Sequence, residues 1–221
     1  MTRREARAPA AAFALAADPA QCRAGFGALL ARADLGPAAA AEVARRYAEP
    51  HRAYHDAAHV GLLWLRHLLH GGDAGDRDMA LAILFHDAVR EPLAPDNAER
   101  SAALLAALVP GDTLWAQAAI RATADPLGHG GQDGRVLRLL DLDLTPLAET
   151  ADVFARNAAA QRRECAALSD AAWRVARRRA LQRLAGAKPL FRTRLGAIYE
   201  AEARANIGAE IAALSAFSGV A

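Results

Sequence analysis

The feature that most constrains the fold of this 221-residue chain is its excess of alanine and its shortage of β-branched residues. Alanine occupies 60 positions, whereas isoleucine and valine together occupy only 13. Strands ordinarily need β-branched residues, while alanine, leucine, arginine and glutamate favour helices. Apolar residues also recur at helical spacing, as at Leu62, Leu65 and Leu69, and no segment alternates apolar and polar residues over the length of a strand. The sequence therefore predicts an all-α protein.

Glycine and proline residues divide the chain into about eight helical segments. No internal repeat and no long linker interrupts them, so we expect a single compact helical domain over residues 1–221. The chemically distinctive residues gather within about 40–150, and the C-terminal helices are expected over about 151–218, as two long blocks at Ala151–Ala185 and Leu190–Phe217. Because these blocks contain no histidine, we expect any chemistry to lie in the first two thirds of the chain.

The balance of charge excludes several kinds of partner. The formal net charge is only +2, with 24% charged residues, and 26 of the 27 basic residues are arginine. Such a balance provides no overall attraction to nucleic acid, which needs basic residues gathered on one face. No apolar run approaches the roughly 18 residues of a membrane span. We therefore expect neither a nucleic acid nor a membrane as partner.

The N-terminus and the cysteines bear on the cell compartment. Residues Met1–Cys22 place arginines ahead of an alanine-rich stretch, as a signal peptide does, but Asp18 and Pro19 interrupt it. Cys22 and Cys165 are the only cysteines, too few for a disulfide framework or a four-thiolate zinc site. A protein of the reducing cytoplasm fits this pattern best.

Histidines lie beside acidic residues in two short clusters. The first cluster, residues 54–59, contains His55 and His59. If both lie on one helix, they stack one turn apart on the same face, and both imidazoles can point into one site.

The second cluster is the doublet His86–Asp87, directly after the apolar run Met79–Phe85. A carboxylate at the inner end of a buried helix needs a cation or a salt bridge. Asp141 and Asp143 are likewise carboxylates within an apolar, leucine-rich run. Imidazole nitrogens and carboxylate oxygens suit a divalent Mn, Mg, Fe, Ni, Co or Zn ion. Two histidines and two aspartates leave positions for water and substrate, which is typical of a catalytic metal.

The ordered set His59, His86–Asp87 and Asp143 resembles the H…HD…D signature of the HD superfamily of metal-dependent phosphohydrolases, a helical fold. The similarity is closer to a bacterial subgroup with the motifs Tyr-His-x-x-x-His, Phe-His-Asp-x-x-Tyr, Asn-x-Glu-x-Ser-Ala and Leu-Asp-x-Asp-Leu. These motifs correspond here to residues 54–59, 85–90, 97–102 and 140–144, and the similarity runs from about residue 40 to about residue 212.

The resemblance implies an HD-type domain and a set of site residues. The implied metal ligands are His59, His86, Asp87 and Asp143, with Asp87 counted among the catalytic residues as well. His55 would be a substrate-facing general acid. The choice of Asp143 over Asp141 depends on alignment with the Ala-Asp-x-Leu pattern of other HD proteins, and Asp141 remains the alternative.

Some positions carry more than one interpretation. Glu99 is a candidate catalytic residue beside a ligand histidine, but with Asp96 it could instead form a capping box. Arg90 stands where the subgroup usually has tyrosine, which leaves the role of that side chain open.

Two further residues are candidates for contact with substrate. His129 lies in the longest irregular stretch, Asp125–Gly134, and such a loop is often functional. Arg177 belongs to an arginine-rich helical face that should be mostly solvated, but the subgroup shows Gly-Arg near this position, so Arg177 could turn inward to hold a phosphate.

The metal-ligand pattern predicts a catalytic metal site, and the resemblance implies a metal-dependent enzyme that hydrolyses a phosphate ester with a metal-activated water. Its partner would be a small phosphorylated molecule, a phosphomonoester or phosphodiester, with nucleotides among the candidates. Two other classes stay open: an HD-fold di-iron oxygenase, which needs more histidine ligands than His129 alone adds, and a non-catalytic nucleotide-binding or scaffold protein with a vestigial site. The C-terminal blocks could bury a homodimer interface.

Overall fold

The computed structural model describes residues 18–216, and every regular element in this range is a helix. The predicted all-α class is confirmed, although eleven α-helices exceed the expected number of about eight. They are α2 (Pro19–Arg32), α3 (Pro37–Tyr47), α4 (Ala57–Leu69), α5 (Arg77–Phe85), α6 (Asn97–Leu108), α7 (Leu114–Ala122), α8 (Gly134–Leu144), α9 (Ala151–Glu164), α10 (Asp170–Gly186), α11 (Arg194–Ala197) and α12 (Glu200–Ala216), with a short 3-10 helix, η2 (Thr145–Ala148), after α8. Most of the stretch Met1–Cys22 and the end of the expected block Leu190–Phe217 lie outside the described residues.

The extra helices arise where the two expected C-terminal blocks divide. Helix α9 ends at Glu164, and α10 begins after Ser169, whose hydroxyl accepts a hydrogen bond from the backbone N–H of Ala172 at 3.2 Å. Thr193 caps α11 in the same way through Gly196. Serine and threonine favour such caps because a side-chain oxygen there satisfies a backbone donor. The alanine-rich composition conceals these short breaks.

Helix α5 forms the centre of the core. All its residues from Met79 to Phe85 are at most 1% exposed. Helices α2, α4, α6, α7 and α8 pack around it. A helix that is apolar on all sides is stable only when it is surrounded in this way. The residues that follow α5 therefore emerge in the interior of the protein.

Helices α2 and α4 approach each other closely at Gly61. A Cβ atom on Gly61 would lie 1.8 Å from the backbone oxygen of Cys22, so a larger residue cannot occupy this position without a shift of backbone. This contact fixes the first half of α4 against α2.

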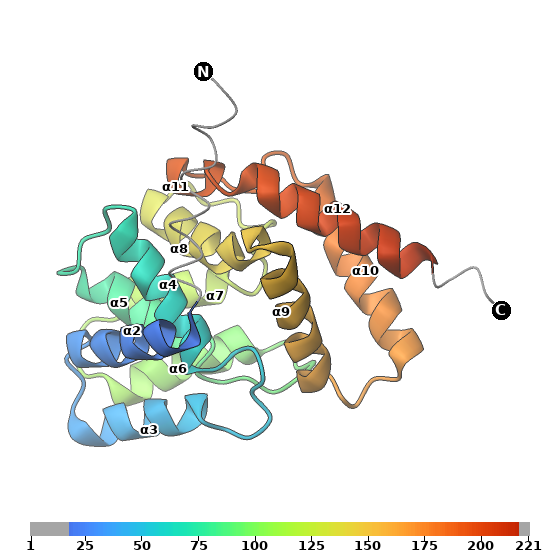
Figure 1. Ribbon diagram of the computed structural model, residues 1–221. Helices are drawn as coiled ribbons and strands as arrows, with labels where there is room; N and C mark the ends of the chain where they lie inside the picture. Colours follow the sequence, from blue (N-terminus) through green and yellow to red (C-terminus); the bar gives the residue numbers. More distant parts are fainter. Residues whose placement is uncertain (1–17, 217–221) are drawn as a thin grey trace.

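The C-terminal helices lie beside this core at one side of the molecule (Figure 1). Helix α12 packs on η2 and α10, and one contiguous apolar cluster extends from Phe26 to Ile207. A buried ion pair between Arg66 of α4 and Glu149 joins the two parts, and Arg66 also donates to Thr145 at 2.8 Å. None of the helices within residues 18–216 has both the length and the apolar character needed to cross a bilayer.

Candidate metal centre

His59 reaches the centre of the site from the first turn of α4. The helix begins after Asp56, whose carboxylate accepts hydrogen bonds from the backbone N–H groups of Ala58 at 2.9 Å and His59 at 3.2 Å. A cap of this kind stabilises a helix by about 1 kcal/mol. Because His55 precedes the cap, the two histidines do not share a helix, which corrects the one-helix geometry considered from their spacing. Their ring centroids nevertheless lie 5.6 Å apart.

His86 and Asp87 follow the last residue of α5, as the sequence predicts. His86 is 2% exposed and Asp87 is 8% exposed. Nδ1 of His86 lies 2.9 Å from the carbonyl oxygen of Ile83, and because that oxygen can only accept, Nδ1 carries a proton. In the neutral ring, Nε2 therefore carries no proton, and its lone pair faces the carboxylates.

Asp143 reaches the same point from the last turn of α8. Its Oδ1 lies 3.4 Å from Nε2 of His59 and 3.7 Å from Nε2 of His86. Oδ2 of Asp87 lies 3.3 Å from Nε2 of His86 and 3.9 Å from Nε2 of His59. Three segments of the chain thus place two imidazoles and two carboxylates around one position, which we call the metal cluster.

The spacing of the nitrogen and oxygen atoms in the metal cluster is compatible with a bound divalent cation. Nε2 of His59 and Nε2 of His86 are buried and make no hydrogen bond. Ligand atoms held about 2.1 Å from a cation lie about 3.0–4.2 Å from one another in tetrahedral and octahedral shells. The four distances above fall within that range. The candidate ligand atoms of His59, His86 and Asp143 all lie within 4.8 Å of one another, so this group of three could hold a metal ion. Asp87, the fourth ligand expected from the sequence, approaches both histidines but is not part of that group.

The buried carboxylate of Asp87 and the half-buried carboxylate of Asp143 need a positive charge near them. Burial by itself would lower the pKa of His86, but Asp87 and Asp143 outweigh it and hold this pKa well above its usual range. Burial would likewise raise the pKa of Asp87, yet the neighbouring His86 holds it well below its usual range. Either a protonated imidazole or a bound cation can supply the charge.

His55 is held by Glu164, a residue that the sequence analysis missed. One oxygen of Glu164, at the end of α9, accepts a 2.5 Å hydrogen bond from Nδ1 of His55. The other accepts from the backbone N–H groups of Ala53, Tyr54 and His55 at 2.9, 2.7 and 2.8 Å. Burial alone would raise the pKa of Glu164, but His55 and these N–H groups lower it to about 2. The residues that contact the candidate site are therefore not confined to the first two thirds of the chain, where the sequence placed the chemistry.

Glu164 also determines the state of His55. Burial lowers the pKa of His55, and Asp87 and Glu164 oppose this only in part. The ring is therefore neutral at pH 7 with its proton on Nδ1, and Nε2 is a hydrogen-bond acceptor. Nε2 lies 4.0 Å from Oδ2 of Asp87, at the edge of the metal cluster.

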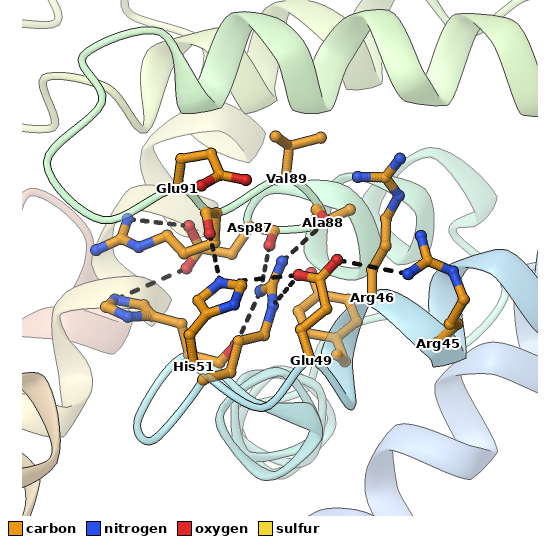
Figure 2. Close-up of polar contacts among 12 residues, drawn as sticks. Arg45, Arg46, Glu49, His51, Asp87, Ala88, Val89 and Glu91 are labelled. Atoms are coloured by element: carbon orange, nitrogen blue, oxygen red, sulfur yellow. Dashed lines mark hydrogen bonds and ion pairs between the residues drawn. The ribbon is translucent and has the colours of Figure 1, made fainter. Parts of the chain in front are cut away.

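The buried side chain of Arg52 joins the two halves of the site. Its Nη1 donates to the carbonyl oxygens of His55 at 3.0 Å and Asp87 at 2.7 Å, and its Nη2 donates to that of Ala88 at 3.0 Å. Its Nε pairs with Glu49 at 3.1 Å. Figure 2 shows Glu49 facing the loop that carries Asp87 and Ala88. Arg52 thus holds the segment before α4 and the segment after α5 in a fixed relation.

Asp141 lies outside the metal cluster. Its carboxylate accepts hydrogen bonds from the backbone N–H groups of Arg192, at 2.9 and 3.1 Å, and Thr193, at 2.7 Å, and from the Thr193 hydroxyl at 2.6 Å. Residues two apart on a helix point about 200° away from each other, so α8 can turn only one of its carboxylates toward the cluster. The structure places Asp143 there and gives Asp141 a contact with the segment before α11.

Glu99 also lies apart from the metal cluster. It is exposed on α6 and pairs with Arg121 of α7 through two contacts, at 2.6 and 3.0 Å. The alternative capping box is not formed either, since Asp96 makes no side-chain cap hydrogen bond.

His129 lies in a segment without helix, as the sequence predicts, and its carbonyl oxygen accepts from Arg192 at 2.6 Å. Its ring does not line the cavities beside the cluster.

Two cavities beside the metal cluster are lined by both His55 and Asp143. The first, of about 240 Å³, is lined largely by polar groups, among them Asp87 and Arg90, and we call it the polar cavity. The second, of about 200 Å³, lies against α9 and α10, and we call it the α9 cavity.

Arg177 turns inward from α10 and lines the α9 cavity. Its Nε and Nη2 pair with Glu210, each at 2.9 Å, and its Nη1 donates to the side chain of Gln161 at 2.7 Å. The inward orientation considered from the sequence is present, but a carboxylate already neutralises this guanidinium.

A pattern on α9 could have revealed the contribution of this helix. Phe154, Asn157, Gln161 and Glu164 recur at intervals of three and four residues, so they share one face. Phe154, Asn157 and Gln161 line the α9 cavity. A stripe with helical spacing that places amides and a carboxylate where a core would need apolar residues indicates a face directed at a polar site.

The comparisons with known proteins leave this site to be interpreted from its own geometry. No family model matches the chain, and the comparisons with curated proteins and with solved structures returned no match.

Proposed function

We propose that this protein is an HD-type metal-dependent phosphohydrolase, which cleaves a phosphate ester of a small molecule. The observation that carries the proposal is the metal cluster, in which two buried imidazole Nε2 atoms without hydrogen bonds face two carboxylates. A divalent cation bound there would polarise a phosphoryl oxygen and make hydroxide available near neutral pH.

The cavities supply access and room for substrate. The polar cavity is lined by His86, Asp87 and Asp143, so the metal cluster is open toward it. The α9 cavity combines apolar side chains with the amides of Asn157 and Gln161, which suits a leaving group that is partly apolar and forms hydrogen bonds. A catalytic metal needs such an open side, whereas a structural metal is enclosed by its ligands.

His55 is placed to move the proton in this reaction. Because Nδ1–H donates to Glu164, Nε2 is free to accept a proton from the attacking water. The same nitrogen can then protonate the leaving oxygen, which is the general-acid role that the resemblance implies. Its position on the walls of both cavities suits these two steps.

The test combines metal analysis with a substrate screen. Protein purified without chelator is analysed for bound metals and then assayed against phosphate esters, including a panel of nucleotides, with added divalent ions. We expect His86→Ala and Asp87→Ala to lose both metal and activity while far-UV circular dichroism shows nearly unchanged helicity. His129→Ala, which removes an imidazole away from the cluster, serves as the matched control.

Other results would point to the competing classes. Activity that persists in His86→Ala would refute the proposal. Two iron ions per chain would favour the di-iron oxygenase, and the absence of stoichiometric metal would favour the non-catalytic protein.

A further inference from the structure

Arg90 is the one arginine or lysine that lines the polar cavity among the residues that the structure describes. Its Nη1 lies 3.3 Å from Oδ1 of Asp87, while Oδ2 of the same carboxylate faces His86 at 3.3 Å. A single carboxylate group thus separates the guanidinium from the metal cluster. Any ligand of a cation in the cluster that extends into the polar cavity would come within reach of Arg90.

The two arginines beside the cluster differ in what they can still bind. Arg177 uses three nitrogens in contacts with Glu210 and Gln161. Arg90 makes one long contact with Asp87, and its side chain remains 33% exposed. A guanidinium has five N–H donors in a planar fork that matches the oxygens of a phosphoryl group. Arg90 therefore has donors to offer that Arg177 has already used.

The backbone that carries Arg90 is held in place. The carbonyl oxygen of Arg90 accepts from Nε2 of His51 at 2.7 Å, and Figure 2 shows His51 beneath the loop that carries Asp87. The preceding residue, Val89, exchanges two hydrogen bonds with Ser101, at 3.0 and 3.3 Å. A side chain that starts from a fixed backbone loses less entropy when it binds a ligand.

The charges around the polar cavity also favour an anionic ligand. Asp87 and Asp143 carry two negative charges, which a divalent cation would balance. Arg90 then supplies the positive charge that remains beside the cluster. An anion that binds there gains a charge-assisted hydrogen bond, which is about twice as strong as a neutral one.

We propose that Arg90 binds and positions the phosphoryl group of the substrate in the polar cavity, while the leaving group extends into the α9 cavity. This inference rests on the proposed function in one respect, that the ligand is a phosphate ester. It assigns a role to the position at which the chain departs from the subgroup motif.

The experiment measures the binding of inorganic phosphate to the full chain, as purified and after addition of Mn²⁺, by calorimetric titration. The variants are Arg90→Gln, Arg90→Lys and, as control, Arg156→Gln. Arg156 pairs with Asp152 at 3.2 Å on the exposed side of α9, so the control removes the same charge from a similar ion pair away from the cavities. Bound metal is measured in every sample.

We expect Arg90→Gln to weaken phosphate binding about 10- to 100-fold. Arg90→Lys should fall between this variant and the wild type, because lysine keeps the charge and loses the fork. Arg156→Gln should bind phosphate as the wild type does, and all samples should contain the same amount of metal. In hydrolysis assays the loss should appear in KM as well as in kcat.

The inference would be overturned if the wild type bound no phosphate, or if Arg90→Gln bound it with unchanged affinity. Loss of metal from Arg90→Gln would also overturn it, because Arg90 would then act by holding Asp87. The proposed function fails separately: phosphate binding that depends on Arg90, in a protein that hydrolyses no phosphate ester, would leave the inference standing and remove the reaction. If Arg90→Gln hydrolysed phosphate esters with an unchanged KM, the proposed function would stand and the inference about Arg90 would fail.

Discussion

Replacement of Glu164 by glutamine tests the part of the site that depends most on tertiary structure. In Glu164→Gln the amide oxygen can still accept the three backbone N–H groups that Oε1 binds, but an NH₂ group now faces Nδ1 of His55. Since two donors cannot bond to each other, the imidazole must move its proton to Nε2. That nitrogen then donates where the proposed reaction needs an acceptor.

The expected loss of stability follows from the charge of Glu164. Its pKa falls from the usual 4.5 to about 2, against the effect of burial and because of His55 and the backbone N–H groups. Because the folded-state pKa lies below the unfolded one, the carboxylate stabilises the fold fully above pH 4.5, and this contribution is lost as the pH falls toward 2. One pKa unit corresponds to about 1.4 kcal/mol, so the contribution at pH 7 is on the order of 3 kcal/mol.

The assay compares the free energy of unfolding in urea, followed by far-UV circular dichroism, for wild type and variant. Glutamine is nearly isosteric with a protonated glutamate, so we expect a difference of about 3 kcal/mol at pH 7 that falls to about 1 kcal/mol at pH 3. The rate of hydrolysis should fall about 10²- to 10⁴-fold, because a general acid or base usually contributes a factor of this size. The amount of bound metal should be unchanged. Glu202→Gln, which changes an exposed glutamate on α12, should have little effect on either quantity.

Two results would refute this reasoning. A stability difference that stays constant between pH 7 and pH 3 would show that the Glu164 carboxylate is not charged and paired as described. Full activity in Glu164→Gln would show that the tautomer of His55 does not matter to the reaction.

Other variants test the remaining assignments. Asp143→Ala should lose the metal, whereas Asp141→Ala should keep the metal and lose about 3 kcal/mol of stability, because the backbone N–H groups that Asp141 binds become unpaired; elemental analysis separates the two. Glu149→Ala removes the carboxylate that pairs with the buried guanidinium of Arg66, and unfolding should become easier by about 3–5 kcal/mol with metal content unchanged; a loss below 1 kcal/mol would contradict the buried ion pair. Gly61→Ala forces α2 away from α4 and should lower the melting temperature, while Gly27→Ala, with open space around it, should raise stability by up to about 1 kcal/mol.

Local chemistry made some of these features predictable. The apolar run before His86 indicated a buried helix, and the structure ends α5 at Phe85 with the His86–Asp87 doublet in the interior. The helical class followed from composition in the same way, because helix propensity and periodicity are properties of neighbouring residues.

Other features were hidden by the same composition. The break between α9 and α10 depends on a cap at Ser169 within an alanine-rich stretch, where propensity alone favours one continuous helix. Glu164, beside that break, looked like one of many charged residues on a solvated helix. The spacing of polar residues on α9 indicates a polar face, but only the tertiary structure shows that Glu164 binds His55, which lies 109 residues earlier in the chain.

The sequence by itself determined that the chain is helical and which side chains have the donor atoms to hold a cation, because both depend on residue type and on spacing within one segment. Only the tertiary structure decided that Asp143 rather than Asp141 faces the histidines, since that depends on how α8 docks and not on what it contains. It also decided that Glu164 orients His55 and that Arg90 keeps more of its donors available than Arg177 does. These are contacts between segments far apart in the chain, and packing determines them.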